Sequence, residues 1–263
     1  MGKTALVTGA SSGIGRAFSE LLAEQGYDLL LVARRSDYLR AVATDAAYLG
    51  VHAETLALDL TDPAAIARLE SALAGRELDL CVNSAGVGDF GPFVESSWER
   101  NEEMIALNAS ACMQVLHVVG TLMASRGYGR IIHVASVAAF QPGPLMSVYY
   151  ASKAYGLSLA EALAEELAGD GVGVTALCPG PTRSPFHGAA GMQIGTAEAR
   201  SMATAREVAE YGYRAALRGK RVVVFGCGFR VMLFLRRVLP RAVVTRAVGA
   251  MQARRRAAGP GAG

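Results

Sequence analysis

A tyrosine and a lysine, Tyr149 and Lys153, lie four residues apart in a stretch whose apolar residues recur at helical spacing. Residues four apart are about one turn apart on a helix, so both side chains point to the same side. A phenol is a poor base at neutral pH, because its unperturbed pKa is about 10. A neighbouring ammonium group favours the phenolate and is expected to lower the pKa of Tyr149. The pair therefore predicts proton transfer, and Lys153 can also donate to a sugar hydroxyl.

A serine, Ser136, follows an apolar run at residues 129–134 that is typical of a buried strand. Ligands of parallel α/β sheets bind at the carboxyl ends of the strands, where this serine is expected to lie. Its hydroxyl can hold the carbonyl or alcohol oxygen of a substrate. Taken singly, each residue also has a structural explanation: helix packing for Tyr149 and Lys153, and strand capping for Ser136.

A glycine-rich segment directly follows the apolar run at residues 4–7 and reads Thr8-Gly9-Ala10-Ser11-Ser12-Gly13-Ile14-Gly15. Gly9 allows a tight turn, Gly13 lets the backbone approach a diphosphate, and Gly15 lets the next helix pack near the sheet. The exposed amides at the start of that helix attract an anion. The turn predicts dinucleotide binding. An ordinary strand-to-helix turn remains the alternative, because the spacing is Gly-x-x-x-Gly-x-Gly rather than the general Gly-x-Gly-x-x-Gly.

A dinucleotide site beside a proton-transferring tyrosine predicts an oxidoreductase, in which the cofactor moves a hydride. The second strand candidate ends in Ala33-Arg34-Arg35, where an NAD-binding protein would carry an acid to hold the ribose hydroxyls. A guanidinium offers a planar fork of donors that fits a ribose phosphate. The two arginines therefore favour NADP(H) over NAD(H), with solvated loop charges as the alternative.

Short apolar runs alternate with longer helical patterns along the chain, which is typical of a doubly wound α/β fold. The strand candidates are residues 5–8, 28–33, 54–58, 78–83, 129–134, 172–178 and 221–225. Right-handed crossovers between them predict one seven-stranded parallel sheet with the first strand central. Between the first two strands, apolar residues at helical spacing predict a helix that Gly26 ends.

As a set, these residues resemble the short-chain dehydrogenase/reductase family over roughly residues 3–226. The motifs that carry the resemblance, in the order of the family, are the glycine turn, Asp59, Asn83-Ser84-Ala85-Gly86, Asn108, Ser136, Tyr149 with Lys153, and Pro179-Gly180. The resemblance implies a single Rossmann-like domain. Ser84 and Ser184 depart from the residues that the family more often has, an asparagine and a threonine, but both keep a polar side chain.

The resemblance also implies roles for residues outside the catalytic pair. Asp59 and Leu60 would contact the adenine, and Asn83, Ala85 and Gly86 would brace the sheet beside the cofactor. Asn108 would hold a water that connects Lys153 to solvent. The segment with Pro179, Gly180, Thr182 and Ser184 would grip the nicotinamide carboxamide. The implied catalytic set is Asn108, Ser136, Tyr149 and Lys153, and the implied assembly is a homodimer or homotetramer.

The charge of the chain is unevenly distributed. Residues 211–263 hold twelve of the 26 lysines and arginines and no acid, while the preceding residues hold all 23 acids. The expected organisation is a catalytic domain at 1–226, a basic amphipathic helical extension at 227–256 and a disordered tail at 257–263. The extension is expected to pack on the acidic body or on another subunit, or to contact an anionic membrane surface. A nucleic-acid partner is not expected, because no binding module is recognised.

The substrate is the least determined feature. Residues 183–202 are rich in alanine, glycine and methionine and are expected to form a lid. Apolar residues favour a largely apolar, even lipid-like, carbonyl compound, and no basic cluster in the lid requires an anion. These apolar residues are Phe90, Phe93, Phe140, Phe186, Met192, Ile194 and Met202. His187 is interpreted as a mobile surface residue.

The sequence also bears on the cellular compartment and on an alternative function. The scattered cysteines Cys81, Cys112, Cys178 and Cys227 indicate reduced core thiols and no metal site. No signal-peptide pattern fits the first residues, so a cytoplasmic protein is expected. The alternative from another class is a sensor or scaffold that binds NADPH without turnover. Such a protein would have no need of the proton-transferring residues.

Overall fold

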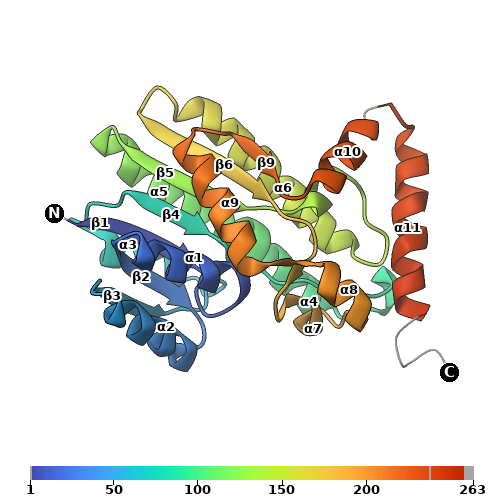
Figure 1. The fold of residues 1–263 in the computed structure, drawn as a ribbon, viewed down its shortest axis with the longest axis horizontal. Coiled ribbons are helices and arrows are strands. Elements are labelled where there is room, and N and C mark those ends of the chain that lie inside the picture. The colour runs from blue at the N-terminus through green and yellow to red at the C-terminus, as the bar shows by residue number, and fades with distance from the viewer. Residues whose placement is uncertain (1, 237, 258–263) are drawn as a thin grey trace.

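A computed structural model of the chain describes residues 2–236 and 238–257 (Figure 1). The disordered tail expected at 257–263 therefore lies, apart from Ala257, outside the described residues. A seven-stranded parallel sheet forms the centre, in the order β3-β2-β1-β4-β5-β6-β9. The strands are β1 (Lys3–Thr8), β2 (Tyr27–Ala33), β3 (Ala53–Ala57), β4 (Leu80–Asn83), β5 (Gly129–Val134), β6 (Val172–Cys178) and β9 (Val222–Val224).

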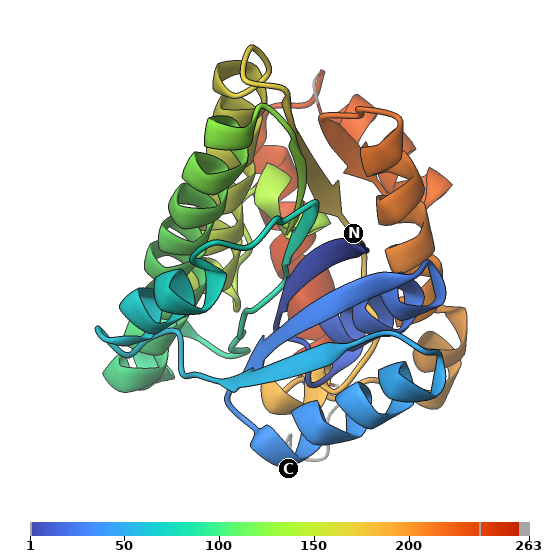
Figure 2. The same cartoon turned by 90° about the vertical axis from the view of Figure 1, so that its left-hand side faces the viewer.

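Helices cover both faces of the sheet, as Figure 2 shows. One face carries α1 (Gly13–Glu24), α2 (Ser36–Tyr48) and α9 (Ala205–Leu217). The other carries α3 (Ala65–Leu73), α5 (Cys112–Arg126) and α6 (Ser147–Glu166), with α4 (Trp98–Ile105) leading into α5. Successive residues of each strand point to opposite faces, so Leu6 belongs to one apolar core and Val7 to the other. A sheet covered on both faces explains why its strands are mostly apolar.

The helix α1 shows how the sequence produces these layers. Its apolar residues recur at helical spacing, and Phe18 and Leu22 are fully buried on the sheet. Each such side chain contributes roughly 1.5–3 kcal/mol by leaving water. Gly26, just beyond the helix, has a φ of +77°, a left-handed conformation that glycine adopts at little cost.

A π-helical segment, η2 (Ala106–Ala111), joins α4 to α5 in one continuous helical run. Among the described residues, this run, Trp98–Arg126, is the one helix long and apolar enough to span a membrane by length and composition. Its buried side packs in the core, where Val115, Val119 and Met123 are fully enclosed. One side of the run therefore belongs to the core of the domain.

Shorter elements lie near the carboxyl edge of the sheet. They are η1 (Phe93–Glu95), η3 (Val137–Phe140), β7 (Thr182–Arg183), α7 (Phe186–Ala189), α8 (Thr196–Ser201) and β8 (Ala203–Thr204). The last helices, α10 (Cys227–Leu235) and α11 (Arg241–Ala257), form an arm on the side of the molecule away from the start of β1 (Figure 1). All seven predicted strands are confirmed, whereas the two-residue pair β7–β8 was not predicted.

Candidate active site

A cavity of about 590 Å³ lies at the carboxyl edge of the sheet. Its lining includes most of the predicted site residues: Gly9, Ser11, Ser12, Gly13, Ile14, Arg34, Arg35, Asp59, Leu60, Ala85, Gly86, Ser136, Tyr149, Lys153, Pro179, Gly180, Thr182 and Ser184. The lining does not include Gly15, Asn83 or Asn108, which lie directly behind it. The fold thus brings residues from seven separate stretches of sequence to one cavity.

The glycine turn has the geometry that an anion site needs. Gly9 and Gly13 have φ values of +67° and +55°, and α1 begins at Gly13, so its first amides face the cavity edge. A Cβ on Gly15 would lie 2.3 Å from the carbonyl oxygen of Gly9, so only glycine allows this approach of helix and turn. A Cβ on Gly13 would lie 3.3 Å from the Cβ of Ser184. The turn and the predicted nicotinamide segment therefore lie against each other.

Asn83 and Thr8 brace the strands beneath the cavity. The Thr8 hydroxyl donates to Asn83 Oδ1 at 3.1 Å and accepts from the amides of Ser84 and Ala85 at 3.0 and 3.1 Å. Asn83 Nδ2 donates to the carbonyl oxygen of Cys112 at 3.1 Å. Asn83 thus ties β1, β4 and α5 together, a bracing position like the one that the resemblance implies.

Asn108 lies within the π-helical segment and is fully engaged by protein groups. Its Oδ1 accepts from the Val87 amide at 2.9 Å, and its Nδ2 donates to the Val87 carbonyl at 2.8 Å and to Ser152 Oγ at 3.0 Å. A Cβ on Gly86 would lie 3.1 Å from Asn108 Oδ1 and 3.5 Å from Lys153 Nζ. The two side chains are therefore neighbours, and the water-relay role of Asn108 stays a prediction.

Tyr149, Ser136 and Lys153 all line the cavity. Burial raises the pKa of Tyr149 to about 12, while a hydrogen bond with Ser136 acts in the opposite direction. Lys153 Nζ lies 6.0 Å from the centre of the Tyr149 ring and donates to the Val134 carbonyl at 2.9 Å. Its own pKa is lowered because it is desolvated. The expectation that Lys153 lowers the pKa of this phenol is wrong for this structure, because desolvation dominates and the ammonium is directed to a backbone carbonyl.

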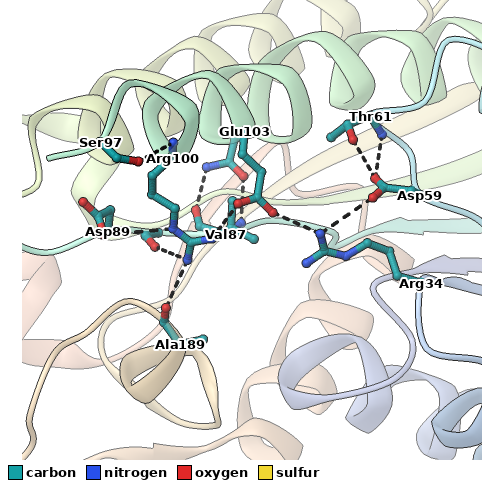
Figure 3. Close-up of polar contacts among 11 residues, drawn as sticks. Arg34, Asp59, Thr61, Val87, Asp89, Ser97, Arg100, Glu103 and Ala189 are labelled. Atoms are coloured by element: carbon teal, nitrogen blue, oxygen red, sulfur yellow. Dashed lines mark hydrogen bonds and ion pairs between the residues drawn. The ribbon is translucent and has the colours of Figure 1, made fainter.

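The two predicted phosphate-binding arginines differ in their surroundings. Arg34 Nη1 lies 3.0 Å from Glu103 Oε1 and 3.7 Å from Asp59 Oδ2, so its charge is shared by two carboxylates (Figure 3). Burial would raise the pKa of Asp59, but hydrogen bonds from Thr61 and the charge of Arg34 outweigh it and hold that pKa below its usual value. Arg35 instead lies 4.1 Å above the Tyr38 ring, and its Nη2 is 3.4 Å from Ser11 Oγ.

This arrangement fits a nicotinamide dinucleotide. The left-handed glycines and the start of α1 form a cradle for the diphosphate, and Ser136 with Tyr149 lies farther along the same cavity. The family pattern of short chain dehydrogenases matches residues 3–195, which contain the glycine turn and the Tyr149–Lys153 pair. The chain belongs to this family. It is therefore a nucleotide-binding oxidoreductase of the short-chain dehydrogenase type.

Similar proteins span most of this dehydrogenase. The sorbitol dehydrogenase of Cereibacter sphaeroides is 37% identical over 182 residues, which cover 68% of this chain and 70% of that protein. A short-chain dehydrogenase from Sphingobium yanoikuyae, solved with NADPH, is 34% identical with a TM-score of 0.79 and covers 84% of this chain and 87% of its own. A Burkholderia phymatum short-chain dehydrogenase/reductase, solved with NAD, is 27% identical with a TM-score of 0.82. The match covers 90% of this chain and 93% of that protein's chain. Both cofactor types thus occur among similar structures.

The substrate end of the dehydrogenase cavity has mainly apolar walls. The rings of Tyr149 and Phe186 lie 5.3 Å apart, and Met146, Tyr150 and Met192 complete this part of the lining. A Cβ on Gly88 would lie 2.6 Å from Phe186 Cζ, so a glycine there leaves room for the ring.

Several expectations about the substrate end of the dehydrogenase are corrected. Of the seven apolar residues expected around the substrate, only Phe186 and Met192 line the cavity. Phe93 is 59% exposed on η1, and Phe140 packs against a core cluster. His187, interpreted as a mobile surface residue, is half-buried and lines the cavity, and its Nε2 lies 3.2 Å from the Thr182 carbonyl oxygen.

Two lining residues of the dehydrogenase come from α11 and were not predicted: Gln252 and Arg255. Arg100 and Tyr150 also line the cavity. The predicted helical extension at 227–256 includes most of α11, and within it the only signal for these two residues is their spacing of three, which places both on one helix face. Nothing in the sequence indicated that this face would meet the active site.

Proposed function

We propose that this dehydrogenase interconverts a carbonyl and an alcohol on a largely apolar substrate, with NADP(H) as cofactor. The observation that carries the proposal is the convergence of Ser136, Tyr149 and Lys153 on the cavity that begins at the glycine turn. The glycine turn and the segment at residues 179–184 would hold the dinucleotide, whose nicotinamide supplies or accepts the hydride when bound.

The protein's own groups would move the proton. Because burial raises the pKa of Tyr149 to about 12, its phenol is protonated at neutral pH and able to donate to a carbonyl oxygen. Ser136 would hold that oxygen in place and stabilise the developing negative charge. Lys153 and Asn108, which lie on the same side of Gly86, would connect the phenol to a replacement proton.

The test is Tyr149→Phe, which removes the proton and keeps the ring. We expect loss of turnover by at least about 100-fold, the usual contribution of general acid–base catalysis, with NADPH affinity nearly unchanged. Tyr155→Phe on the exposed side of the same helix is the matched control. Turnover is followed as NADPH consumption with a panel of ketones, aldehydes and acyl thioesters. A variant that keeps near-normal rates with its best substrate would remove Tyr149 from this role.

The alternative is a sensor or scaffold that binds NADPH without turnover. The same panel distinguishes it, because tight NADPH binding with no consumption of any compound favours the sensor. The enzyme is supported by Ser136, Tyr149 and Lys153, which line the cavity together.

Preference for NADP(H) over NAD(H) is supported by Arg35. Its guanidinium lies beside Ser11 at the edge of the glycine turn, where it can meet a ribose phosphate. Arg34 supports the preference less than expected, because Asp59 and Glu103 already share its charge.

A homodimer or homotetramer is part of the proposal. The outer side of the α4–α6 layer exposes apolar side chains, with Ile105 45%, Met113 43% and Tyr155 40% exposed. A second copy packing on this layer would cover them. Light scattering coupled to gel filtration measures the mass, and a monomer at micromolar concentration would contradict the assembly.

A cytoplasmic location with peripheral membrane contact also stays a proposal. On the arm that α10 and α11 form, the apolar side chains of Val231, Phe234 and Val238 are 60%, 65% and 74% exposed. The exposed residues Arg230 and Arg241 flank them. Such a surface fits anionic lipids. The test is flotation with phosphatidylserine vesicles at two salt concentrations, comparing the full chain with Phe234→Ser. Absence of the full chain from the lipid fraction would rule the contact out.

A further inference from the structure

The side chain of Tyr150, the residue after the proposed proton donor, brings a second phenol to the cavity. Tyr150 lines the cavity and is only 8% exposed. Its ring meets the Tyr149 ring edge-on, with the ring centres 6.2 Å apart. A Cβ on Gly143 would lie 2.3 Å from Tyr150 Cγ, so glycine at this position leaves room for the ring. The ring is therefore held by its packing, and its hydroxyl has a defined place.

The helix α11 reaches this hydroxyl. Val248 and Gln252, one turn apart, are 9% and 1% exposed, and Val248 packs in one cluster with Met146 and Tyr150. Gln252 Nε2 donates to the Tyr150 hydroxyl oxygen at 3.2 Å. Buried polar groups of folded proteins are normally hydrogen-bonded, and this bond links α11 to the catalytic helix α6.

The orientation of the Gln252 amide is set at both of its ends. Arg255 Nη1 lies 3.4 Å from Gln252 Oε1, and a guanidinium can only donate, so the amide oxygen faces it. The sulfur of Met146, a weak acceptor, lies 3.7 Å from Gln252 Nε2. A reversed amide would set N–H groups against the guanidinium. Gln252 therefore presents a donor, and not an acceptor, to Tyr150.

Because it accepts from Gln252, the Tyr150 hydroxyl keeps its own proton for another acceptor. A phenol hydroxyl has one proton to donate and can accept at its oxygen. Among the described residues, Gln252 is the one hydrogen-bond partner of this hydroxyl. Burial raises the pKa of Tyr150, although the Gln252 hydrogen bond and the charge of Arg255 act against this rise, so the phenol stays protonated at neutral pH. A buried O–H group without an acceptor costs free energy, which an acceptor on a ligand would recover.

We propose that Tyr150 is a specificity-determining residue that donates a hydrogen bond to a second, uncharged oxygen of the substrate, an ether or a carbonyl. This inference rests on the proposed function. The reacting oxygen is assigned to Ser136 and Tyr149, so the second oxygen belongs to another part of the substrate. Phe186 and Met192 line the same end of the cavity and would contact the apolar part. The substrate class is an apolar ketone that carries one further hydrogen-bond acceptor.

The direction of the Tyr150–Gln252 hydrogen bond separates this subsite from a bond that only holds α11 in place. Glutamate has nearly the shape of glutamine, but its ionised side chain only accepts hydrogen bonds. In Gln252→Glu, the new carboxylate would lie beside Arg255 and accept the proton of the Tyr150 hydroxyl. The link between α11 and α6 would remain, whereas the donor available to a substrate would be lost. A bond with only a structural role predicts no change in ligand preference.

The test uses saturated ring ketones in pairs. One member is the plain ketone, and in the other an ether oxygen replaces one ring CH2 at increasing distance from the carbonyl. Binding is measured by calorimetry on the NADP+ complex, in which a ketone cannot be reduced, and turnover is measured as NADPH consumption. The variants are Tyr150→Phe, which removes the hydroxyl, and Gln252→Glu, which reverses its hydrogen bond. Tyr155→Phe removes an exposed hydroxyl from the same helix outside the lining and is the control.

The readout is the ratio of the affinities for the two members of a pair. We expect the wild-type protein to prefer the ether ketone by about 3- to 10-fold for at least one position of the oxygen, as one neutral hydrogen bond contributes. Tyr150→Phe and Gln252→Glu should each bring this ratio close to one, and the ratio of their KM values should change in the same way. Tyr155→Phe should keep the wild-type ratio.

Two failures are distinguishable. A wild-type ratio of one at every position of the ether oxygen, or a ratio that Tyr150→Phe or Gln252→Glu leaves unchanged, would overturn the subsite even if the ketones are reduced. A preference for the ether ketones that depends on Tyr150, without turnover of any ketone, would leave the subsite standing and refute the proposed reaction.

Discussion

Replacing Arg35 by alanine is expected to remove the contact with the 2′-phosphate of NADPH that we propose for this dehydrogenase. The guanidinium is prearranged by the Tyr38 ring at 4.1 Å and by Ser11 Oγ at 3.4 Å, so little conformational freedom is lost on binding. Arg34 is the matched comparison, because it is adjacent in sequence but is paired with Asp59 and Glu103 (Figure 3).

The magnitude follows from the exposure of the site. Hydrogen bonds to charged groups contribute about 1.5–3 kcal/mol, and Arg35 is exposed, so solvent screening reduces this to about 1–2 kcal/mol. The dissociation constant of NADPH should therefore rise by about 5- to 30-fold in Arg35→Ala. That of NADH, which lacks the phosphate, should change by less than about twofold. Arg34→Ala should affect the two cofactors to the same degree.

Fluorescence titration of both reduced cofactors against the wild-type protein and the two variants measures these constants. The ionic strength must be held fixed, because an exposed phosphate contact is screened by salt. An equal loss of NADPH and NADH affinity in Arg35→Ala would refute the phosphate contact. A wild-type protein that binds NADH more tightly than NADPH would refute the cofactor preference itself.

Three further perturbations test other parts of the structure. Gly15→Ala should destabilise the fold by about 1–3 kcal/mol in urea unfolding and weaken NADPH binding, because the new Cβ would meet the Gly9 carbonyl oxygen at 2.3 Å; unchanged stability would contradict this contact. Burial lowers the pKa of His133 to about 3, so between pH 6.5 and 3 the unfolded chain binds a proton on this side chain and the folded chain does not. The free energy of unfolding should therefore fall as the pH drops from about 6.5 to 3. In acid unfolding, His133→Gln should lose this part of the pH dependence. Gln252→Leu should cost about 1–2 kcal/mol in thermal unfolding by leaving the Tyr150 hydroxyl without its donor, and an unaltered melting temperature would show that this hydrogen bond contributes nothing.

The fold could be predicted from the sequence because, in doubly wound α/β proteins, the apolar runs that mark the strands and the connections between them lead to the same sheet. Apolar runs covered on both faces identified all seven sheet strands, and right-handed crossovers then fixed their parallel arrangement. The first strand was expected at the centre of the sheet. In the structure β4 holds the middle position, and β1 is its direct neighbour. The site residues contributed by strand ends and by the Tyr149–Lys153 helix could be predicted for the same reason, since the carboxyl ends of parallel strands share one edge.

The remaining features depend on contacts that no local pattern encodes. The pKa of Tyr149 is set by how deeply the phenol is buried, which spacing alone does not reveal. The different roles of Arg34 and Arg35 depend on Glu103, a residue from α4 that is distant in sequence. The placement of α11 on α6 depends on Val248, which packs against Met146 and Tyr150, and on Gln252, which donates to the hydroxyl of Tyr150.

The inward face of α11 has a consequence for how such proteins diversify. The proposed reacting groups lie at the sheet edge and on α6, whereas α11 contributes Gln252 and Arg255 to the lining of the same cavity. Changes in α11 can therefore alter which compounds are accepted while leaving the hydride and proton chemistry intact. Exchange of α11 between relatives is a direct route to new selectivity.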